Sequence, residues 1–216
     1  ETWWKNSRII ELKSGGSEID SPETAKLPNA CVKVELSNTN LSEFNYIPTN
    51  LVSLSLKNNK FLQNVNLTSE TNLQTVDFDK NEFLHNVDVG TQKNLTDLNL
   101  GGQIRTLAGE LPELETLDVS NTELNRIDLN DATKLKNLVA SNTKIKSIDA
   151  RSYQSLEVLN LSGCTDFGKD QITSLLLPDS YALKDIDLSD TSVQSEELGK
   201  VLNELDAKNI EDGSVK

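Results

Sequence analysis

The amino-acid sequence predicts a solenoid, a stack of short and mostly β coils closed by a C-terminal helix. Three observations predict it. One apolar motif recurs eight times at nearly constant spacing. The apolar residues are mainly aliphatic, and aromatic residues make up only 5% of the chain. The last apolar segment then changes to helical spacing. We therefore expect the 216 residues to form one repeat array rather than one or two globular domains.

The recurring motif is Leu-x-x-Leu-x-Leu-x-x-(Asn/Thr/Cys), with other apolar residues replacing Leu at some positions. The eight units begin at Cys31, Leu51, Leu73, Leu95, Leu114, Leu135, Leu156 and Leu183. Their spacings are 20, 22, 22, 19, 21, 21 and 27 residues, within the roughly 20 to 29 residues of leucine-rich repeats. The sequence thus predicts a leucine-rich-repeat solenoid, or horseshoe, with eight units over residues 31–193.

Each unit predicts two short extended segments. Its first half alternates apolar and polar residues, as in a strand with one buried face, and these strands are expected to stack into one parallel sheet. The polar ninth residue, such as Asn59, Asn81 or Gln103, is predicted to point inward and bond backbone groups that the turn leaves unpaired. The second half is too short for a full helix, which predicts a short return strand or an extended turn.

Two units are expected to be irregular. The unit that begins at Leu95 is short and rich in glycine. The unit that begins at Leu156 is about six residues longer, and residues 170–177 fit one or two helical turns. Tyr153 and the segment 167–181 carry the few aromatic residues that we expect to be exposed.

A stacked array exposes apolar surface at both ends and needs caps. Residues 1–30 lack the repeat, and the adjacent Trp3 and Trp4 are predicted to cover the first coil. An interface anchored on the same pair is the alternative. At the other end, Ser195 is followed by two acids and then by apolar residues at helical spacing. Residues 194–216 are therefore predicted to form a C-terminal capping helix and a polar tail.

Charge and hydropathy exclude two classes of partner. The chain contains twenty-one Lys and Arg residues and thirty-four Asp and Glu residues, which gives a net charge of −13. Such a field repels phosphate backbones and anionic lipid headgroups. No segment approaches the roughly 20 apolar residues that a membrane-spanning helix needs. We expect neither nucleic-acid binding nor membrane insertion.

The sequence offers almost nothing for catalysis. His85 is the one histidine, no nucleophile motif accompanies it, and we interpret it as a surface residue. Cys31 and Cys164 lie six strand steps apart, on the order of 29 Å, which exceeds the roughly 7 Å limit for a disulfide. They are predicted to be buried and unpaired. We therefore predict no enzyme, no catalytic residue and no cofactor.

The exposed residues of the predicted strands form polar columns on the concave face. One column supplies the candidate ligand-binding residues, Glu35, Asp77, Asn99, Asp118, Asn160 and Asp187. This face lacks the Trp, Tyr and Arg that usually anchor interfaces, so a ligand is expected to be basic or sugar-like, or held weakly through many contacts. Neighbouring acids can recruit Ca²⁺, but no loop follows a calcium pattern, so we predict no metal site. The irregular segments, with Arg105 and Tyr153, are the alternative ligand surfaces.

The repeat also resembles a known family. The pattern Leu-x-x-Leu-x-x-Ser-Asn-Thr-x-Leu-x-x-Ile-Asp-Leu, at residues 114–129 and nearly again at 135–150, is similar to the 21-residue repeats of internalin J and related bacterial surface proteins. The resemblance covers residues 31 to about 193. It implies an extracellular or cell-surface protein, secreted or attached to the wall, that binds host or neighbouring-cell partners.

These observations predict non-enzymatic recognition. We expect a monomer that binds a protein or glycan ligand as part of a bacterial surface or secreted protein. Two alternatives remain open, a structural scaffold module within a larger cell-wall or phage assembly and an intracellular regulatory repeat protein.

Overall fold

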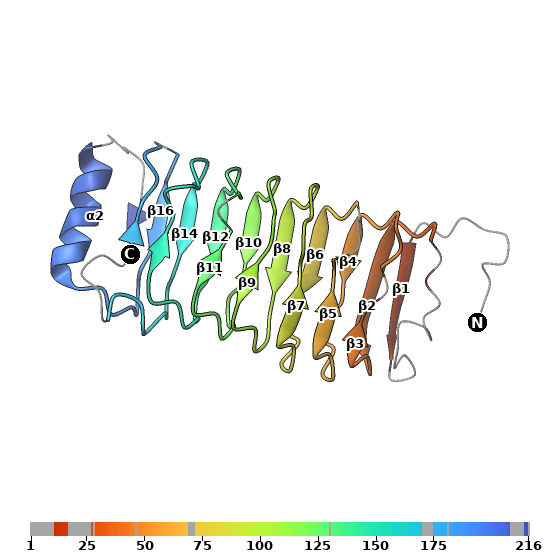
Figure 1. Cartoon of the computed structure of the whole chain (residues 1–216). Coiled ribbons are helices and arrows are strands. Elements are labelled where there is room, and N and C mark those ends of the chain that lie inside the picture. The colour runs from red at the N-terminus through yellow and green to blue at the C-terminus, as the bar shows by residue number, and fades with distance from the viewer. Residues whose placement is uncertain are drawn as a thin grey trace.

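The computed structural model is a parallel β-solenoid that ends in a helix (Figure 1), which confirms the predicted fold class. It describes residues 11–16, 27, 29–45, 47–68, 72–129, 131–169, 175–180, 182–207 and 214–215. Trp3 and Trp4, to which the sequence assigned the N-terminal cap, lie outside the described residues, as does Tyr181. The boundaries of the cap, the repeats and the tail therefore remain predictions.

One long parallel sheet runs the length of the solenoid, and each repeat unit contributes one of its strands. Two further strands, β1 and β17, extend its edges. The ten strands, in spatial order, are β1 (Glu11–Gly16), β2 (Lys33–Thr39), β4 (Ser53–Ser55), β6 (Thr75–Phe78), β8 (Asp97–Leu100), β10 (Thr116–Asp118), β12 (Asn137–Val139), β14 (Val158–Asn160), β16 (Asp185–Asp187) and β17 (Ser214–Val215).

The tail was expected to be only polar, but β17 belongs to this sheet. The Ser214 amide donates to the Lys184 carbonyl oxygen at 2.7 Å. This bond pairs a backbone group at the otherwise open edge of β16, which is the reason that a tail segment adds to the sheet.

The return side of the solenoid carries shorter strands, as predicted. The first three, β3 (Glu43–Phe44), β5 (Asn64–Asn66) and β7 (Asn86–Asp88), form one sheet. Two pairs follow, β9 (Leu107–Ala108) with β11 (Ile127–Asp128) and β13 (Ile148–Asp149) with β15 (Leu175–Leu176). Leu175 and Leu176 thus form a strand where the sequence allowed a helical turn. Residues 170–174 lie outside the described part of the chain.

The core is a continuous aliphatic column between the two sides. The three apolar motif residues of all eight units are buried, as Leu54 and Leu56 show for β4. Burying one such side chain contributes roughly 1.5–3 kcal/mol, so the repeat itself supplies most of the stabilising apolar contact.

Buried asparagines connect neighbouring coils at the turn after the long-sheet strands. The Asn59 amide nitrogen Nδ2 donates to the carbonyl oxygens of Leu36 and Leu56 at 2.9 and 2.7 Å. Its Oδ1 accepts from the Thr39 amide at 2.7 Å, and the Asn59 amide donates to Asn81 Oδ1 at 2.7 Å. The inward position predicted for the ninth residue is correct here.

Gln103 does not take this inward position, and the prediction for it was wrong. It is exposed, and its backbone amide donates to Leu84 O at 2.7 Å. Only three residues separate Leu100 from Ile104, so the chain turns early and Ile104 is buried instead. A different glutamine, Gln92, is buried on the return side and donates to the carbonyl oxygen of Val89 at 3.1 Å.

Tyr153 and Phe167 are buried, although the sequence led us to expect exposed aromatic residues in these units. The core positions nearby in the chain include the small residues Ala140 and Ala150. A close-packed interior then needs larger side chains to fill the space. Burial raises the pKa of the Tyr153 hydroxyl to about 12, so it stays neutral at physiological pH.

Both cysteines are buried, and neither forms a disulfide within the described part of the chain, as predicted. Cys164 occupies the ninth position of its unit and acts there as a hydrogen-bonding group. Its Sγ lies 3.0 Å from the Ala140 carbonyl oxygen and 3.1 Å from Thr143 Oγ1. A thiol therefore takes the place that asparagine and threonine hold in other coils.

The C-terminal end is covered by helix α2 (Ser195–Ala207), as predicted (Figure 1). Val201 is buried, and Leu198 and Leu205 pack against the core. Leu202 remains 45% exposed. Glu197 is buried and accepts a hydrogen bond from the Leu175 amide at 3.0 Å, which ties the helix to β15. Across the described residues, no helix has the length and hydropathy to cross a membrane.

Candidate functional site

The predicted ligand-binding residues lie in one row across the long sheet. Cα pairing runs from Glu35 through Ser55, Asp77 and Asn99 to Asp118. It continues through Val139 to Asn160 and Asp187. All six candidates are half-buried, with the alternate apolar residues facing the core. Neighbours in the row are thus about 4.8 Å apart.

The sheet face is hollowed over five strands, β2 to β10. The hollow measures about 690 Å³, and Glu35, Asp77, Asn99 and Asp118 line it. Small residues such as Ser55 leave the space between them. We call this surface the long-sheet hollow.

Asn160 and Asp187 do not reach this hollow. They line a separate one of about 160 Å³. Val139, which stands between the two groups in the row, interrupts the polar surface. The structure therefore brings together four of the six predicted residues.

Lysines from neighbouring coils neutralise part of the acidic charge. Lys57 Nζ lies 2.8 Å from Asp77 Oδ2, and Lys13 Nζ lies 3.0 Å from Glu35 Oε2. The hydrogen bond to Asp77 raises the pKa of Lys57. The hydrogen bond from Lys13 lowers the pKa of Glu35. The long-sheet hollow is therefore a surface of alternating charge, which the reasoning from column composition missed.

A recurring local motif fixes the acid and amide side chains of the row. Ser120 donates through its amide and its hydroxyl to Asp118 Oδ1, at 2.9 and 2.6 Å. Ser162 does the same to Asn160 Oδ1, at 2.9 and 2.7 Å. One oxygen of Asp118 is thereby held in place, which preorganises the carboxylate for a ligand. The signal in the sequence was the repeated Asp/Asn-x-Ser spacing, typical of side-chain turns.

The described residues hold no group of three histidine, cysteine or acidic side chains that could bind a metal ion. The long-sheet hollow instead contains hydrogen-bond donors on positively charged lysines and acceptors on negatively charged carboxylates. This arrangement suits recognition of a polar ligand through many contacts.

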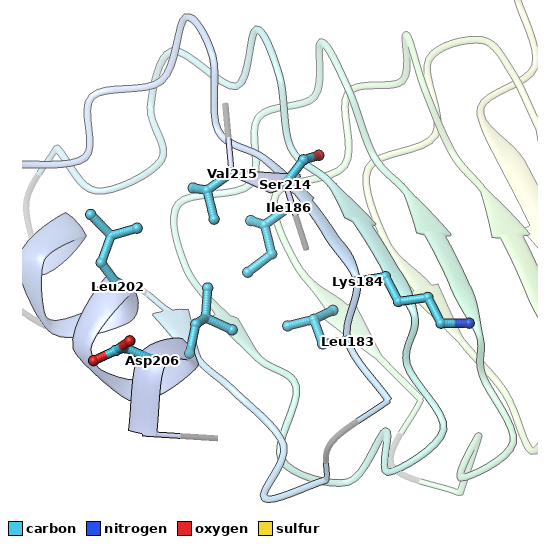
Figure 2. Close-up of a pocket in the computed structure, with 8 residues that line it drawn as sticks. Leu183, Lys184, Ile186, Leu202, Asp206, Ser214 and Val215 are labelled. Carbon is cyan, nitrogen blue, oxygen red and sulfur yellow. The ribbon is translucent and has the colours of Figure 1, made fainter. Parts of the chain in front are cut away.

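A further cavity, of about 210 Å³, lies at the C-terminal end. Figure 2 shows Leu202 and Asp206 of α2 facing the same space as Leu183, Ile186 and Val215. The cavity is the seam between the capping helix and the last coil, and its apolar lining follows from that position.

Sequence reasoning also missed two exposed phenylalanines. Phe61 and Phe83 are 56% and 52% exposed. In their units two residues separate the buried asparagine from the next buried leucine, whereas one residue separates Thr122 from Leu124. This one-residue insertion is visible in the spacing of the repeat residues, and it places a large apolar side chain outside the core.

The parallel solenoid, its repeat unit and its row of polar strand residues define a leucine-rich-repeat fold. This assignment rests on the register of the chain's own strands. No protein-family model matches the sequence, and no curated protein matches it.

Among solved structures, the chain is similar to bacterial leucine-rich-repeat proteins. One is a leucine-rich-repeat protein of Leptospira interrogans, with 14% identity, 96% of this chain and 90% of that chain covered, and a TM-score of 0.35. Another is an internalin of Listeria monocytogenes, with 12% identity, 96% and 86% covered, and a TM-score of 0.27.

Proposed function

We propose that this protein is a non-enzymatic recognition module that binds a protein or glycan ligand through the long-sheet hollow. The observation that carries the proposal is the hollow itself. Glu35, Asp77, Asn99 and Asp118 line one open space of about 690 Å³ on a rigid parallel sheet. Side chains on strands are held more precisely than side chains on loops, which favours recognition by a preformed surface.

The lining determines the class of ligand. Carboxylates beside small hydroxyl-bearing residues bind ammonium, guanidinium or sugar hydroxyl groups, and Lys33 and Lys57 add donors for a ligand carboxylate or hydroxyl. The described residues that line the hollow include no aromatic side chain, so affinity comes from many polar contacts. The ligand is therefore a basic protein surface or a glycan, bound with salt-sensitive affinity.

The repeat pattern supports the setting. Its similarity to internalin-type repeats supports a bacterial surface or secreted protein, and a module outside the cell is part of this proposal. A monomer suffices for this function, because the hollow is built entirely from one chain.

A binding screen tests the proposal. The purified protein is screened against extracellular host proteins and a glycan array, with and without Ca²⁺ and at two salt concentrations. The expected result is a specific ligand whose binding weakens at high salt and does not need Ca²⁺. The absence of any specific ligand under every condition would contradict the recognition function.

A further inference from the structure

The two exposed phenylalanines lie on adjacent coils at equivalent positions. Phe61 directly precedes the buried Leu62, and Phe83 directly precedes the buried Leu84. The return strands that follow them, β5 and β7, are paired neighbours. The two rings therefore extend from positions about one strand spacing apart. More than half of each residue's surface is exposed to solvent, which folding alone does not favour.

A polar hollow lies beside the segment that directly follows Phe83. It measures about 420 Å³ and is lined by His85, Asn86, Gln103, Arg105 and Thr106. His85 Nδ1 lies 2.9 Å from the Phe83 carbonyl oxygen, so the imidazole donates this bond and is held beside Phe83. Its other nitrogen remains available to a ligand.

Arg105 is the cation of this hollow, and it differs from the other described arginines. Arg126 and Arg151 each pair with an aspartate of their own coil, at 2.8 and 2.6 Å. Arg105 has no ion pair within the described part of the chain. An arginine without a partner is notable in a protein of net charge −13, because thirty-four acids compete for twenty-one cations.

We propose that this surface, the aromatic edge formed by Phe61, Phe83, His85 and Arg105, docks a partner-protein segment that carries an acidic residue next to a large apolar one. The apolar side chain packs on the two rings, where it removes exposed aromatic area from water. The carboxylate enters the hollow and accepts hydrogen bonds from the Arg105 guanidinium, which suits bidentate pairing. The amide groups of Asn86 and Gln103 supply further donors.

The aromatic edge is distinct from the long-sheet hollow. Phe83 and His85 lie between β6 and β7, and Arg105 lies between β8 and β9, at the turns that lead to the return side. The two surfaces also differ in chemistry, because the edge combines apolar rings with an unpaired cation. The long-sheet hollow contains no aromatic residue. The protein can therefore hold two partners, or two parts of one partner.

Selection from a phage-displayed library of short random peptides tests the proposal. The expected result is enrichment of peptides in which Asp or Glu adjoins Phe, Leu, Ile or Trp. Phe83→Ser and Arg105→Gln should each weaken binding of such a peptide by about tenfold or more. Both side chains are at the surface, and thermal unfolding of the variants verifies that they fold.

Matched controls separate this surface from general effects of charge or hydrophobicity. Leu202→Ser removes another exposed apolar side chain. Lys144→Gln removes another exposed cation, from the corresponding turn two units further along the solenoid. Neither should change binding by more than about twofold. In Arg105→Glu, a peptide with Lys in place of its acidic residue should bind better than the original peptide, because the charges are exchanged.

Three results would overturn the proposal. The first is selection of peptides without the acidic–apolar pair. The second is equal loss of binding in the control variants. The third is binding of acidic glycans on an array, dependent on Phe83 and Arg105, without peptide binding, which would make the edge a glycan site. Alanine variants of Asp77 and Asp118 leave peptide binding unchanged if the two surfaces are independent.

Discussion

Asn59 shows how one residue holds three coils in register. Its side chain bonds backbone groups of the coil before it and of its own coil. Its backbone amide donates to the Asn81 side chain of the next coil. These groups are buried, so none of them can turn to water if the side chain is lost.

Replacing Asn59 with alanine is expected to lower the free energy of unfolding by about 3 kcal/mol, because a buried donor and buried acceptors lose their partner. Asn45→Ala removes an exposed asparagine nearby and should change the free energy of unfolding by no more than about 0.5 kcal/mol. Urea unfolding followed by circular dichroism measures both. Equal effects of the two substitutions would contradict this role for Asn59.

Lys80 occupies a backbone conformation that suits asparagine or glycine. Its φ is 59°, and the equivalent residues Asn38, Asn58, Asn121 and Asn142 have φ between 55° and 58°. The Asn58 side chain also donates to Asn38 Oδ1. Lysine supplies neither the tolerance of this conformation nor the hydrogen bond.

Lys80→Asn is therefore expected to raise the free energy of unfolding by about 0.5–1 kcal/mol. The exposed contact of Lys80 with Asp79, at 3.9 Å, contributes little that the substitution would lose. Lys60→Asn, at a fully exposed position without positive φ, is the control. Thermal unfolding in which Lys80→Asn melts no higher than the wild type would argue against strain at this turn.

Single residues were predictable where the repeat is regular. The inward positions of Asn59 and Asn81 follow from their place in the motif. The prediction for Gln103 fails because its turn is two residues shorter than theirs. The polar row from Glu35 to Asp118 follows from strand alternation. Its pairing with lysines does not follow from strand alternation. Lys13 comes from β1, which precedes the repeats, and Lys57 comes from the turn after β4.

At the scale of elements, charges of alternating sign link four successive coils. Lys136 Nζ lies 2.7 Å from Glu115, and Lys184 Nζ lies 2.6 Å from Glu157. The hydrogen bond and charge of Lys184 hold the pKa of Glu157 below its usual value. A lowered pKa in the folded state means that this contribution to stability is present above the unfolded pKa and is lost as pH falls through the folded pKa.

Glu157→Gln should consequently reduce stability at neutral pH but have little effect near pH 3. The difference in the free energy of unfolding between this variant and the wild type should shrink as pH falls from about 5 to about 3, where carboxylates titrate. Urea unfolding at low salt across this range measures it. Glu123→Gln, an exposed acid without an ion pair in the described chain, is the control. A difference that is the same at pH 7 and pH 3 would show that the ion pair is not its cause.

The capping helix α2 gives the second prediction at this scale. Val201 is buried against the last coil, whereas the larger Leu202 is 45% exposed. Val201→Ala should cost about 2 kcal/mol of stability, and Leu202→Ala less than about 1 kcal/mol. Thermal unfolding of both variants shows which substitution costs more stability. A larger loss in Leu202→Ala would mean that the other helix face covers the solenoid.

The start of α2 at Ser195 was predictable from its capping signal, and so were the short return strands. The orientation of the helix was not, because four apolar residues at helical spacing span more surface than the last coil covers. The strand at Leu175 and Leu176 was missed because a short apolar run fits a strand and a helical turn equally well.

The whole molecule is a rigid parallel stack that presents two chemically different surfaces. The regular repeat predicted the solenoid, because each unit buries its apolar face only against its neighbours. It did not predict the extent of the long-sheet hollow, which ends where Val139 interrupts the row. The aromatic edge arises from one-residue insertions, and its surroundings depend on which residues of the next coil lie beside it.

The central claim is that the long-sheet hollow binds the ligand. The most direct test compares the affinity of the screened ligand for two double variants that remove equal charge. Asp77→Ala with Asp118→Ala alters the hollow, and Asp88→Ala with Asp128→Ala alters the return strands β7 and β11. Binding should weaken by about tenfold or more in the first variant and by no more than about twofold in the second. Equal affinity of both variants would contradict the central claim.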